Sequence, residues 1–264
     1  MEVIIYHNHV YFFRKEIMMK YQRDALQHLR GHWLALIALL FISKCLGSLL
    51  MDFFVGYDSL LTTILSALMT VFVITILMIG FNFGVWKVAN DQYPTLNLVF
   101  AGFKKDNYAT LVELGFIKSI LMEIITFLAT LIFLPQFGIA KIIQYNVNLG
   151  SLLLEVLQQI SRGKIDNNLL NLTLLICVVM FILIIFVGAY FDILFFAKIA
   201  HSQWSLKDVF INTNHVLRNN WRKLIWLQVT FIPWYLTSIF TFSLSLIFVI
   251  PFNQVALAIF YKER

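Results

Sequence analysis

Five charged residues lie inside long apolar stretches of this sequence, where their chemistry would be unusual. They are Lys44, Glu113, Lys118, Glu123 and Asp192. A lone charge in an apolar environment costs several kcal/mol or more and therefore tends to find a partner of opposite charge. The spacing predicts that Lys44 pairs with Glu123, and Lys118 with Asp192. Such pairs serve structure or line a path for protons or ions, and the sequence leaves both interpretations open.

A second arrangement with chemical interest is the pair His28 and His32, four residues apart. This spacing can place two imidazoles on one helix face, where they could hold a metal ion. However, "HLRGH" lacks the Glu that a zinc hydrolase helix needs, and the sequence contains neither a Gly-rich phosphate loop nor a GxSxG nucleophile motif. We therefore expect no metal, no cofactor and no enzymatic activity.

The composition shows what kind of elements must position these residues. Of 264 residues, 60% are hydrophobic and 13% are charged, and the mean hydropathy is +0.82. These values lie well outside the range of soluble domains and predict a membrane protein. In such a protein, the net charge of +6 favours contact with anionic lipid headgroups over binding of nucleic acid.

The apolar residues gather into segments long enough to cross a bilayer. A hydrocarbon core of about 30 Å requires about 20 apolar residues per helix. This criterion predicts an all-α, polytopic transmembrane bundle that forms one integral membrane domain over residues 1–264. Its six spans are expected at residues 33–51, 60–86, 111–134, 169–197, 224–240 and 242–261.

The basic residues predict the orientation of these spans. Most of the 20 Lys and Arg lie before span one, between spans two and three, between spans four and five, or after span six. The loops on the opposite side contain only Lys141, Arg162 and Lys164. By the positive-inside rule, we expect a multi-pass protein of the cell membrane with both termini cytoplasmic.

A short motif recurs where spans one, three and five begin. The motif begins with a basic residue, and an aromatic residue follows three positions later, directly after a His or Asn. Leu and another aliphatic residue lie three and four positions after the aromatic residue. We call these the entry motifs, and their basic and aromatic members are Arg30 and Trp33, Lys105 and Tyr108, and Arg218 and Trp221. Basic groups can contact lipid phosphate while aromatic rings lie at headgroup depth. Their recurrence on alternate spans predicts three hairpin repeats.

A short segment of mixed polarity precedes each entry motif. In residues 1–32 it predicts a cytoplasmic helix lying in the membrane interface, with Phe13, Ile17, Tyr21 and Leu26 on one stripe. Before the third motif, "SLKD" at 205–208 resembles a capping box with Asp in place of Glu. Residues 135–168 do not follow the repeat pattern. They are expected to form an extracellular loop, with a surface helix in "SLLLEVLQQI".

The order of these features resembles a family of uncharacterised integral membrane proteins of Gram-positive bacteria, catalogued as domain of unknown function 975. The resemblance rests on "ALQHLRGHW", on "FAGF" before span three, and on the C-terminal third, from "AYFDILFF" to "ALAIFY". It covers nearly the whole chain. It implies a polytopic membrane fold but assigns no catalytic or binding residue.

Two classes of function remain after enzymes are set aside. The first is a non-enzymatic membrane protein that acts through protein or lipid contacts, for example in immunity against a membrane-active peptide or in tolerance of envelope stress. The second is a transporter or permease subunit that works with a separate ABC-type ATPase, which the repeats and the intramembrane charges favour. The missing catalytic motifs, the aromatic residues and the basic interfacial segments favour the first.

Overall fold

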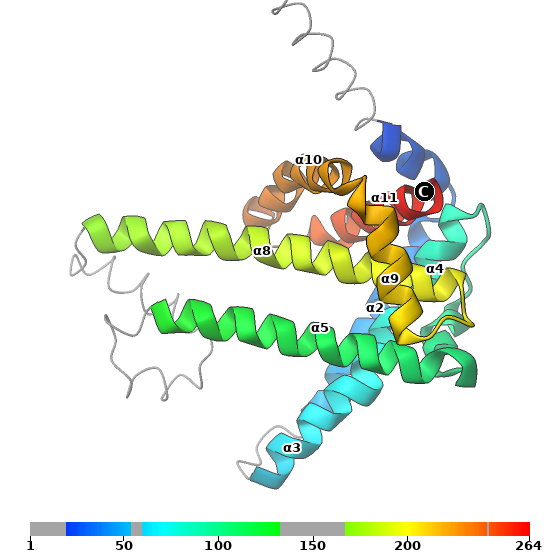
Figure 1. Cartoon of the computed structure of the whole chain (residues 1–264), viewed down its shortest axis with the longest axis horizontal. Helices are drawn as coiled ribbons and strands as arrows, with labels where there is room; N and C mark the ends of the chain where they lie inside the picture. The colour runs from blue at the N-terminus through cyan, green and yellow to red at the C-terminus, as the bar shows by residue number, and fades with distance from the viewer. Residues whose placement is uncertain (1–19, 54–59, 133–166, 242) are drawn as a thin grey trace, which may run out of the picture. The chain divides into compact units, whose positions relative to one another are not determined.

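The computed structural model describes residues 20–53, 60–132, 167–241 and 243–264, and within these ranges the chain is helical without any strand. This confirms the predicted all-α class. Figure 1 traces the elements in chain order: α2 (Trp33–Asp52), α3 (Leu60–Met69), the π-helical turn η1 (Thr70–Ile74), α4 (Thr75–Ala89), the 3₁₀-helix η2 (Leu96–Phe103), α5 (Lys105–Ile132), α8 (Asn167–Ala200), α9 (Leu206–Arg218), α10 (Trp221–Phe240) and α11 (Leu246–Lys262). Residues 20–29 form a further short helix ahead of α2.

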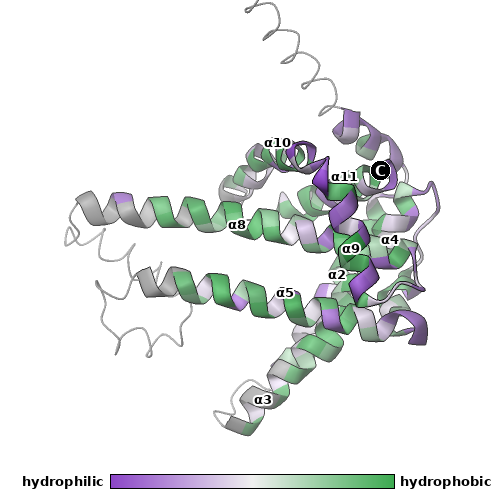
Figure 2. Ribbon diagram, viewed as in Figure 1, coloured by the Kyte–Doolittle hydropathy of each residue, from purple (hydrophilic) through white to green (hydrophobic). Residues whose placement is uncertain are grey.

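Each of the six predicted spans overlaps a helix in the described residues, although the last helix, α11, begins at Leu246, four residues later than predicted. The second consists of α3, η1 and α4 in direct succession, and the last two are separated by a turn that contains Ser243 with φ of 68°. The third starts earlier than predicted, because Lys105 of the entry motif is already the first residue of α5. Within the described residues, three stretches are long and apolar enough to cross a membrane, namely Trp33–Asp52, Thr70–Ala89 and Val178–Ala200. Figure 2 shows this hydrophobic character along α8, and it shows hydrophilic residues in the connection that follows α4.

The chain divides into two compact units, one comprising Met1–Phe116 with Ala189–Arg264 and the other comprising Ile117–Gly188. In the first unit, α4 is the central helix and packs against α2, η2 and α11. Both α4 and α11 are buried around most of their circumference. Helices that are apolar on every side are typical of the interior of a bundle.

Two glycines allow the close packing of α4. A Cβ on Gly80 would lie 2.3 Å from the carbonyl oxygen of Val99 in η2, and one on Gly84 would lie 2.5 Å from Leu39 Cδ1 in α2. The sequence "GFNFG" thus brings α4 against two different neighbours, with one glycine for each. This is the usual role of small residues where backbones approach closely.

Short helices form the segments of mixed polarity that precede the three entry motifs. Ahead of the third motif, Ser205 and Asp208 form the predicted capping box at the start of α9. The short helix ahead of the second motif, η2, is a 3₁₀-helix rather than an α-helix. In the first, the predicted stripe is wrong at Leu26, which is 47% exposed, because a residue five positions from the buried Tyr21 points to another side of a 3.6-residue helix. Phe13 and Ile17 of that stripe lie outside the described residues, as do most of the predicted extracellular loop and its surface helix.

Candidate functional site

A cluster of polar side chains lies between α10 and α11 in the first unit. Asn253 of α11 and Gln228 of α10 are almost completely buried and exchange two amide hydrogen bonds of 3.3 Å. Asn253 Nδ2 also donates to the Tyr235 hydroxyl at 2.8 Å. Buried polar groups are retained only when they are hydrogen-bonded, and these amides meet that condition through each other.

Asp192 of α8 lies next to this cluster along α11. Gln254, the residue after Asn253, donates from Nε2 to Asp192 Oδ2 at 2.6 Å. The other atom of that amide, Gln254 Oε1, is buried and accepts no hydrogen bond from the described part of the chain. The result is a carboxylate and an unsatisfied carbonyl oxygen brought together by α8 and α11, two helices with few other polar side chains.

In each predicted charge pair, one residue belongs to the first compact unit and the other to the second. Lys44 and Asp192 belong to the first unit, whereas Lys118 and Glu123 belong to the second. Pairing of Lys44 with Glu123, and of Lys118 with Asp192, therefore stays a prediction. For Asp192 the structure adds a partner that the sequence did not suggest, the amide of Gln254.

Lys198 is a buried cation that the sequence analysis assigned to a cytoplasmic boundary. Its side chain is 2% exposed, and its Nζ donates to the backbone carbonyls of Asp106 at 3.1 Å, Trp204 at 3.0 Å and Ser202. These three acceptors match the three donors of an ammonium group. Lys198 thereby ties the end of α8 to the first turn of α5, which is a structural role. The residue type alone gave no signal of it.

The entry motifs have exposed basic residues and aromatic rings in three different settings. The Arg30, Lys105 and Arg218 side chains are exposed. The Trp33 ring lies 6.0 Å from Phe248, and the Trp221 ring stacks on Tyr190 at 5.9 Å. Tyr108 instead donates its hydroxyl to the carbonyl of Phe72 in the π-helical turn at 3.2 Å.

Burial follows the same register in the first and third copies. Tyr21, Ala25 and Leu29 are buried before the first motif, and Val209, Thr213 and Leu217, each 188 positions later, are buried before the third. The agreement continues past the aromatic residue with two leucines in each copy. These leucines, Leu36 and Leu39, Leu111 and Leu114, and Leu224 and Leu227, are 0–1% exposed in all three copies.

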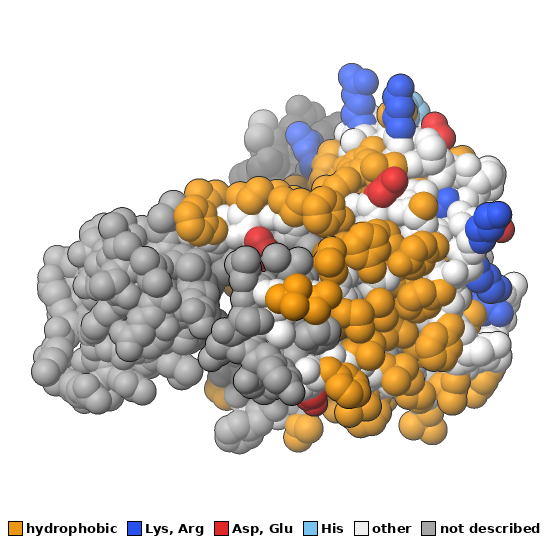
Figure 3. Space-filling view, turned by 90° about the horizontal axis from the view of Figure 1, so that it is seen from below, with side chains coloured by type: hydrophobic (Ala, Val, Ile, Leu, Met, Phe, Trp, Pro, Cys, Tyr) orange, Lys and Arg blue, Asp and Glu red, His pale blue; other side chains and the backbone are white. Residues whose placement is uncertain are grey.

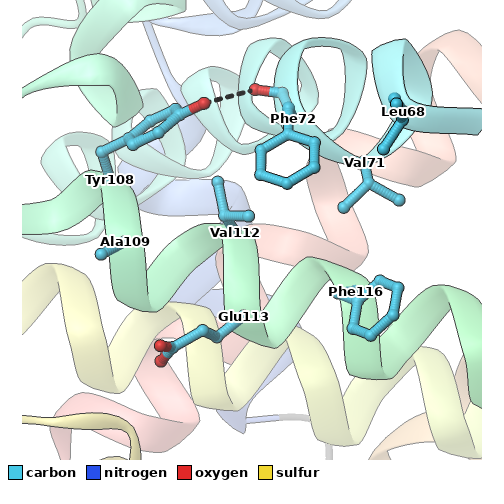
Figure 4. Close-up of a pocket in the computed structure, with 8 residues that line it drawn as sticks. All are labelled: Leu68, Val71, Phe72, Tyr108, Ala109, Val112, Glu113 and Phe116. Carbon is cyan, nitrogen blue, oxygen red and sulfur yellow. Dashed lines mark hydrogen bonds between the residues drawn. The ribbon is translucent and has the colours of Figure 1, made fainter. Parts of the chain in front are cut away.

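An open apolar groove of about 640 Å³ lies beside the π-helical turn. It is lined by α3, η1 and the first turns of α5, and Figure 4 shows Phe72, Val112 and Phe116 on its walls, with Tyr108 bonded across one end. Glu113 lies on the rim, and its carboxylate points away from Phe72. The groove offers mainly apolar contacts, with the Tyr108 hydroxyl at one end and Glu113 on its rim.

The two histidines have different neighbours. His28 Nδ1 lies 2.6 Å from Asp91 Oδ1, whereas the His32 ring packs edge-on against Tyr93. No group of three or more metal-ligating side chains occurs within the described residues.

These features define an all-α protein whose described part includes three helices suited to a membrane, with polar side chains enclosed between α8, α10 and α11. The chain belongs to the family described as Protein of unknown function (DUF975), whose model matches residues 14–263. No curated protein and no solved structure matches the chain.

Proposed function

We propose that this chain is a multi-pass protein of the cell membrane, with six spans in three hairpin repeats and with both termini cytoplasmic. The proposal is supported by the two faces of α2. The inner face carries the buried residues Leu36, Leu39, Ser43 and Gly47. The outer face carries Leu34 and Phe41, which are 83% and 67% exposed. Large apolar side chains on an outer surface suit lipid and not water.

The hairpin repeats are supported by the shared register of burial. A constant offset of 188 residues relates the buried positions of the first and third copies on both sides of the aromatic residue. The backbone at the N-caps of α2 and α10 is also similar in the first and third copies. His32 has φ, ψ of −112°, −6°, and Asn220 has −123°, 3°. The middle copy shares the two buried leucines but differs ahead of them, where a 3₁₀-helix replaces the α-helix.

Cysteine labelling tests the orientation. Gly150→Cys, in the predicted extracellular loop, is expected to react with a membrane-impermeant maleimide in intact cells, and Lys262→Cys only after the cells are opened. Accessibility of position 262 and protection of position 150 in intact cells would show the opposite orientation.

Within the membrane, we propose a non-enzymatic role through protein or lipid contacts, as in immunity against a membrane-active peptide or tolerance of envelope stress. The observation that carries this proposal is the combination of exposed apolar side chains with exposed basic residues at the entry motifs. Figure 3 displays one face where hydrophobic side chains form a broad field and Lys and Arg side chains gather at its border. Such a border matches a bilayer surface that contains anionic headgroups, each basic residue contributing about 1 kcal/mol of attraction.

Exposure of cells to a cationic membrane-active peptide tests the role. Cells that express the chain are expected to survive a higher peptide concentration than cells with an empty vector, without any change in uptake or export of labelled peptide. The variant with both Arg30→Ser and Arg218→Ser should lose much of this protection, whereas Lys207→Ser, an exposed basic residue outside the entry motifs, should retain it. Equal survival with and without the chain would contradict the proposal.

A second candidate function is a permease subunit that works with an ABC-type ATPase. It is favoured by Asp192, Asn253 and Gln228, because polar residues inside apolar helices mark transport paths in many membrane proteins. Solute flux in liposomes, or an ATPase that co-purifies with the chain, would support this function over the first.

A further inference from the structure

We propose that the apolar groove beside the π-helical turn η1 binds one anionic phospholipid. An acyl chain lies in the groove, and the phosphate group contacts Lys104 and Lys105 at one end of it. The inference rests on the proposed location of the chain in a membrane, and it names a particular lipid as a partner. All residues that line the groove belong to the first compact unit.

The walls of the groove are apolar and open to the outside of the protein. Leu68, Phe72 and Phe116 line it, and each is between 43% and 50% exposed. Large apolar side chains that lie together on a surface mark a place where another apolar molecule binds. In a membrane, the hydrocarbon tails of lipids are the apolar molecules that surround the protein.

The size of the groove favours an extended chain over a helix. From Tyr108 to Phe116 the groove follows α5 for about 12 Å, at 1.5 Å per residue. A helix with its side chains is about 10–12 Å in diameter, so a segment of that length occupies roughly 1,000 Å³ or more. The groove has a volume of about 640 Å³. It therefore has room for an acyl chain but not for a transmembrane helix of a partner.

Contacts at two places fix the walls of the groove. The Tyr108 hydroxyl donates to the Phe72 carbonyl at 3.2 Å, as Figure 4 shows, and the Tyr108 ring stacks on Phe103 at 5.9 Å. Further along α5, a Cβ on Gly115 would lie 2.5 Å from Thr75 Cγ2, so the two helices touch there. A site with fixed walls loses little conformational freedom when a ligand binds.

The Tyr108 end of the groove continues into two lysines. Lys105, Ala109, Val112 and Phe116 follow one another at intervals of four, three and four residues and therefore share one face of α5. The last three line the groove, so Lys105 lies on the same face one turn before it. Lys104 directly precedes α5, and both lysines are exposed.

The charges at this end select an anionic group. The amino terminus of α5 adds a partial positive charge to those of Lys104 and Lys105. Asp106, the acidic residue of the first turn, lies about 100° around the helix from Lys105. Glu113 on the rim is about 12 Å along α5 from Lys105, and its carboxylate points away from Phe72. A phosphate at the lysines thus meets an excess of positive charge.

Counting of bound lipid tests the proposal. The full chain in a neutral detergent is mixed with phosphatidylglycerol, or with phosphatidylcholine of the same acyl chains, and bound lipid is measured by native mass spectrometry. We expect one phosphatidylglycerol per chain to bind saturably, about fivefold or more tightly than phosphatidylcholine. Lys105→Gln should weaken phosphatidylglycerol binding about fivefold, because a basic residue near an anionic headgroup contributes about that factor. Lys207→Gln, at an exposed position outside the entry motifs, should not weaken it.

A second variant tests the groove itself. Ala109 is exposed and lines the groove, so Ala109→Trp should fill it and abolish saturable binding of phosphatidylglycerol. Leu34→Trp, which adds an indole at an exposed apolar position of α2, is the control and should bind as the wild type does. Melting temperatures without lipid show whether each variant folds. Lys105→Gln alters only a surface charge and carries the test if Ala109→Trp does not fold.

Three outcomes would overturn the lipid site. Equal binding of the two lipids would show unspecific contact, and unchanged binding by a folded Ala109→Trp variant would place the lipid elsewhere. Efficient disulfide cross-linking of Phe116→Cys between two chains in membranes would show that a second copy covers the groove. Labelling at positions 150 and 262 tests the membrane orientation separately, so a failure of the lipid site alone is distinguishable from a failure of the proposed function.

Discussion

Gly80 of α4 lies so close to Val99 of η2 that a Cβ atom would come within 2.3 Å of the Val99 carbonyl oxygen and 2.5 Å of its Cα. These are backbone atoms, which cannot rotate away as the end of a side chain can. The contact therefore fixes how η2 lies along α4, and through η2 where α5 begins.

We predict that Gly80→Ala destabilises the protein by about 2 kcal/mol, because the added methyl forces the two backbones apart. Gly188→Ala is the matched control, since it adds the same methyl inside a helix where no atom lies within 4 Å. Alanine favours a helix over glycine by about 1 kcal/mol, so the control should gain stability. Melting temperatures in one detergent check this, and equal effects at the two positions would show that the Val99 contact does not constrain α4.

The repeat predicts equal importance for Leu36 and Leu224, which are 188 residues apart and fully buried. Leu36→Ala and Leu224→Ala should each cost about 2–5 kcal/mol, the usual range for a buried leucine. Leu34→Ala, at a position 83% exposed, should cost much less. Losses at positions 36 and 224 that differ as widely as those at 36 and 34 would argue against equivalent places in the fold.

The capping box of α9 predicts a dependence of stability on pH. Hydrogen bonds from Ser205 Oγ and N to the Asp208 carboxylate, at 2.6 and 3.0 Å, lower the pKa of Asp208. Because the folded pKa lies below the unfolded value, the contribution is fully present above the unfolded pKa of about 3.9 and is lost as pH falls through the folded value.

Ser205→Ala should therefore lower the melting temperature near neutral pH, because it removes the side chain that caps α9. The difference from wild type should shrink as pH falls below about 4. Ser202→Ala, in the exposed loop ahead of α9, serves as the control and should not alter the pH profile. A Ser205→Ala deficit that stays constant down to the lowest pH would mean that the Asp208 carboxylate does not contribute.

The predicted pair of Lys44 and Glu123 is tested by a double-mutant cycle. If the two charges pair within the membrane, Lys44→Ala should lower the melting temperature more than the combined Lys44→Ala and Glu123→Ala change, since an isolated buried charge costs more than an absent pair. Independent, additive losses would show that Lys44 has another environment.

The sequence alone determined the helical class, the six apolar segments and the entry motifs. These features follow from local patterns, because a run of apolar residues of bilayer length is helical wherever it lies. The capping box of Ser205 and Asp208 was predictable for the same reason, since it involves only neighbours along one turn.

The tertiary structure decided which side chains meet. The sequence marked Asp192 as a costly residue but suggested a lysine as its partner, whereas α11 presents Gln254 to it. It also assigned Lys198 to a boundary, although three backbone carbonyls enclose its ammonium group. Side-chain amides donate and accept, and backbone carbonyls accept, in many settings, so neither leaves a pattern of spacing. Their partners depend on how helices distant in sequence pack, which is set by close contacts such as that of Gly80 with Val99.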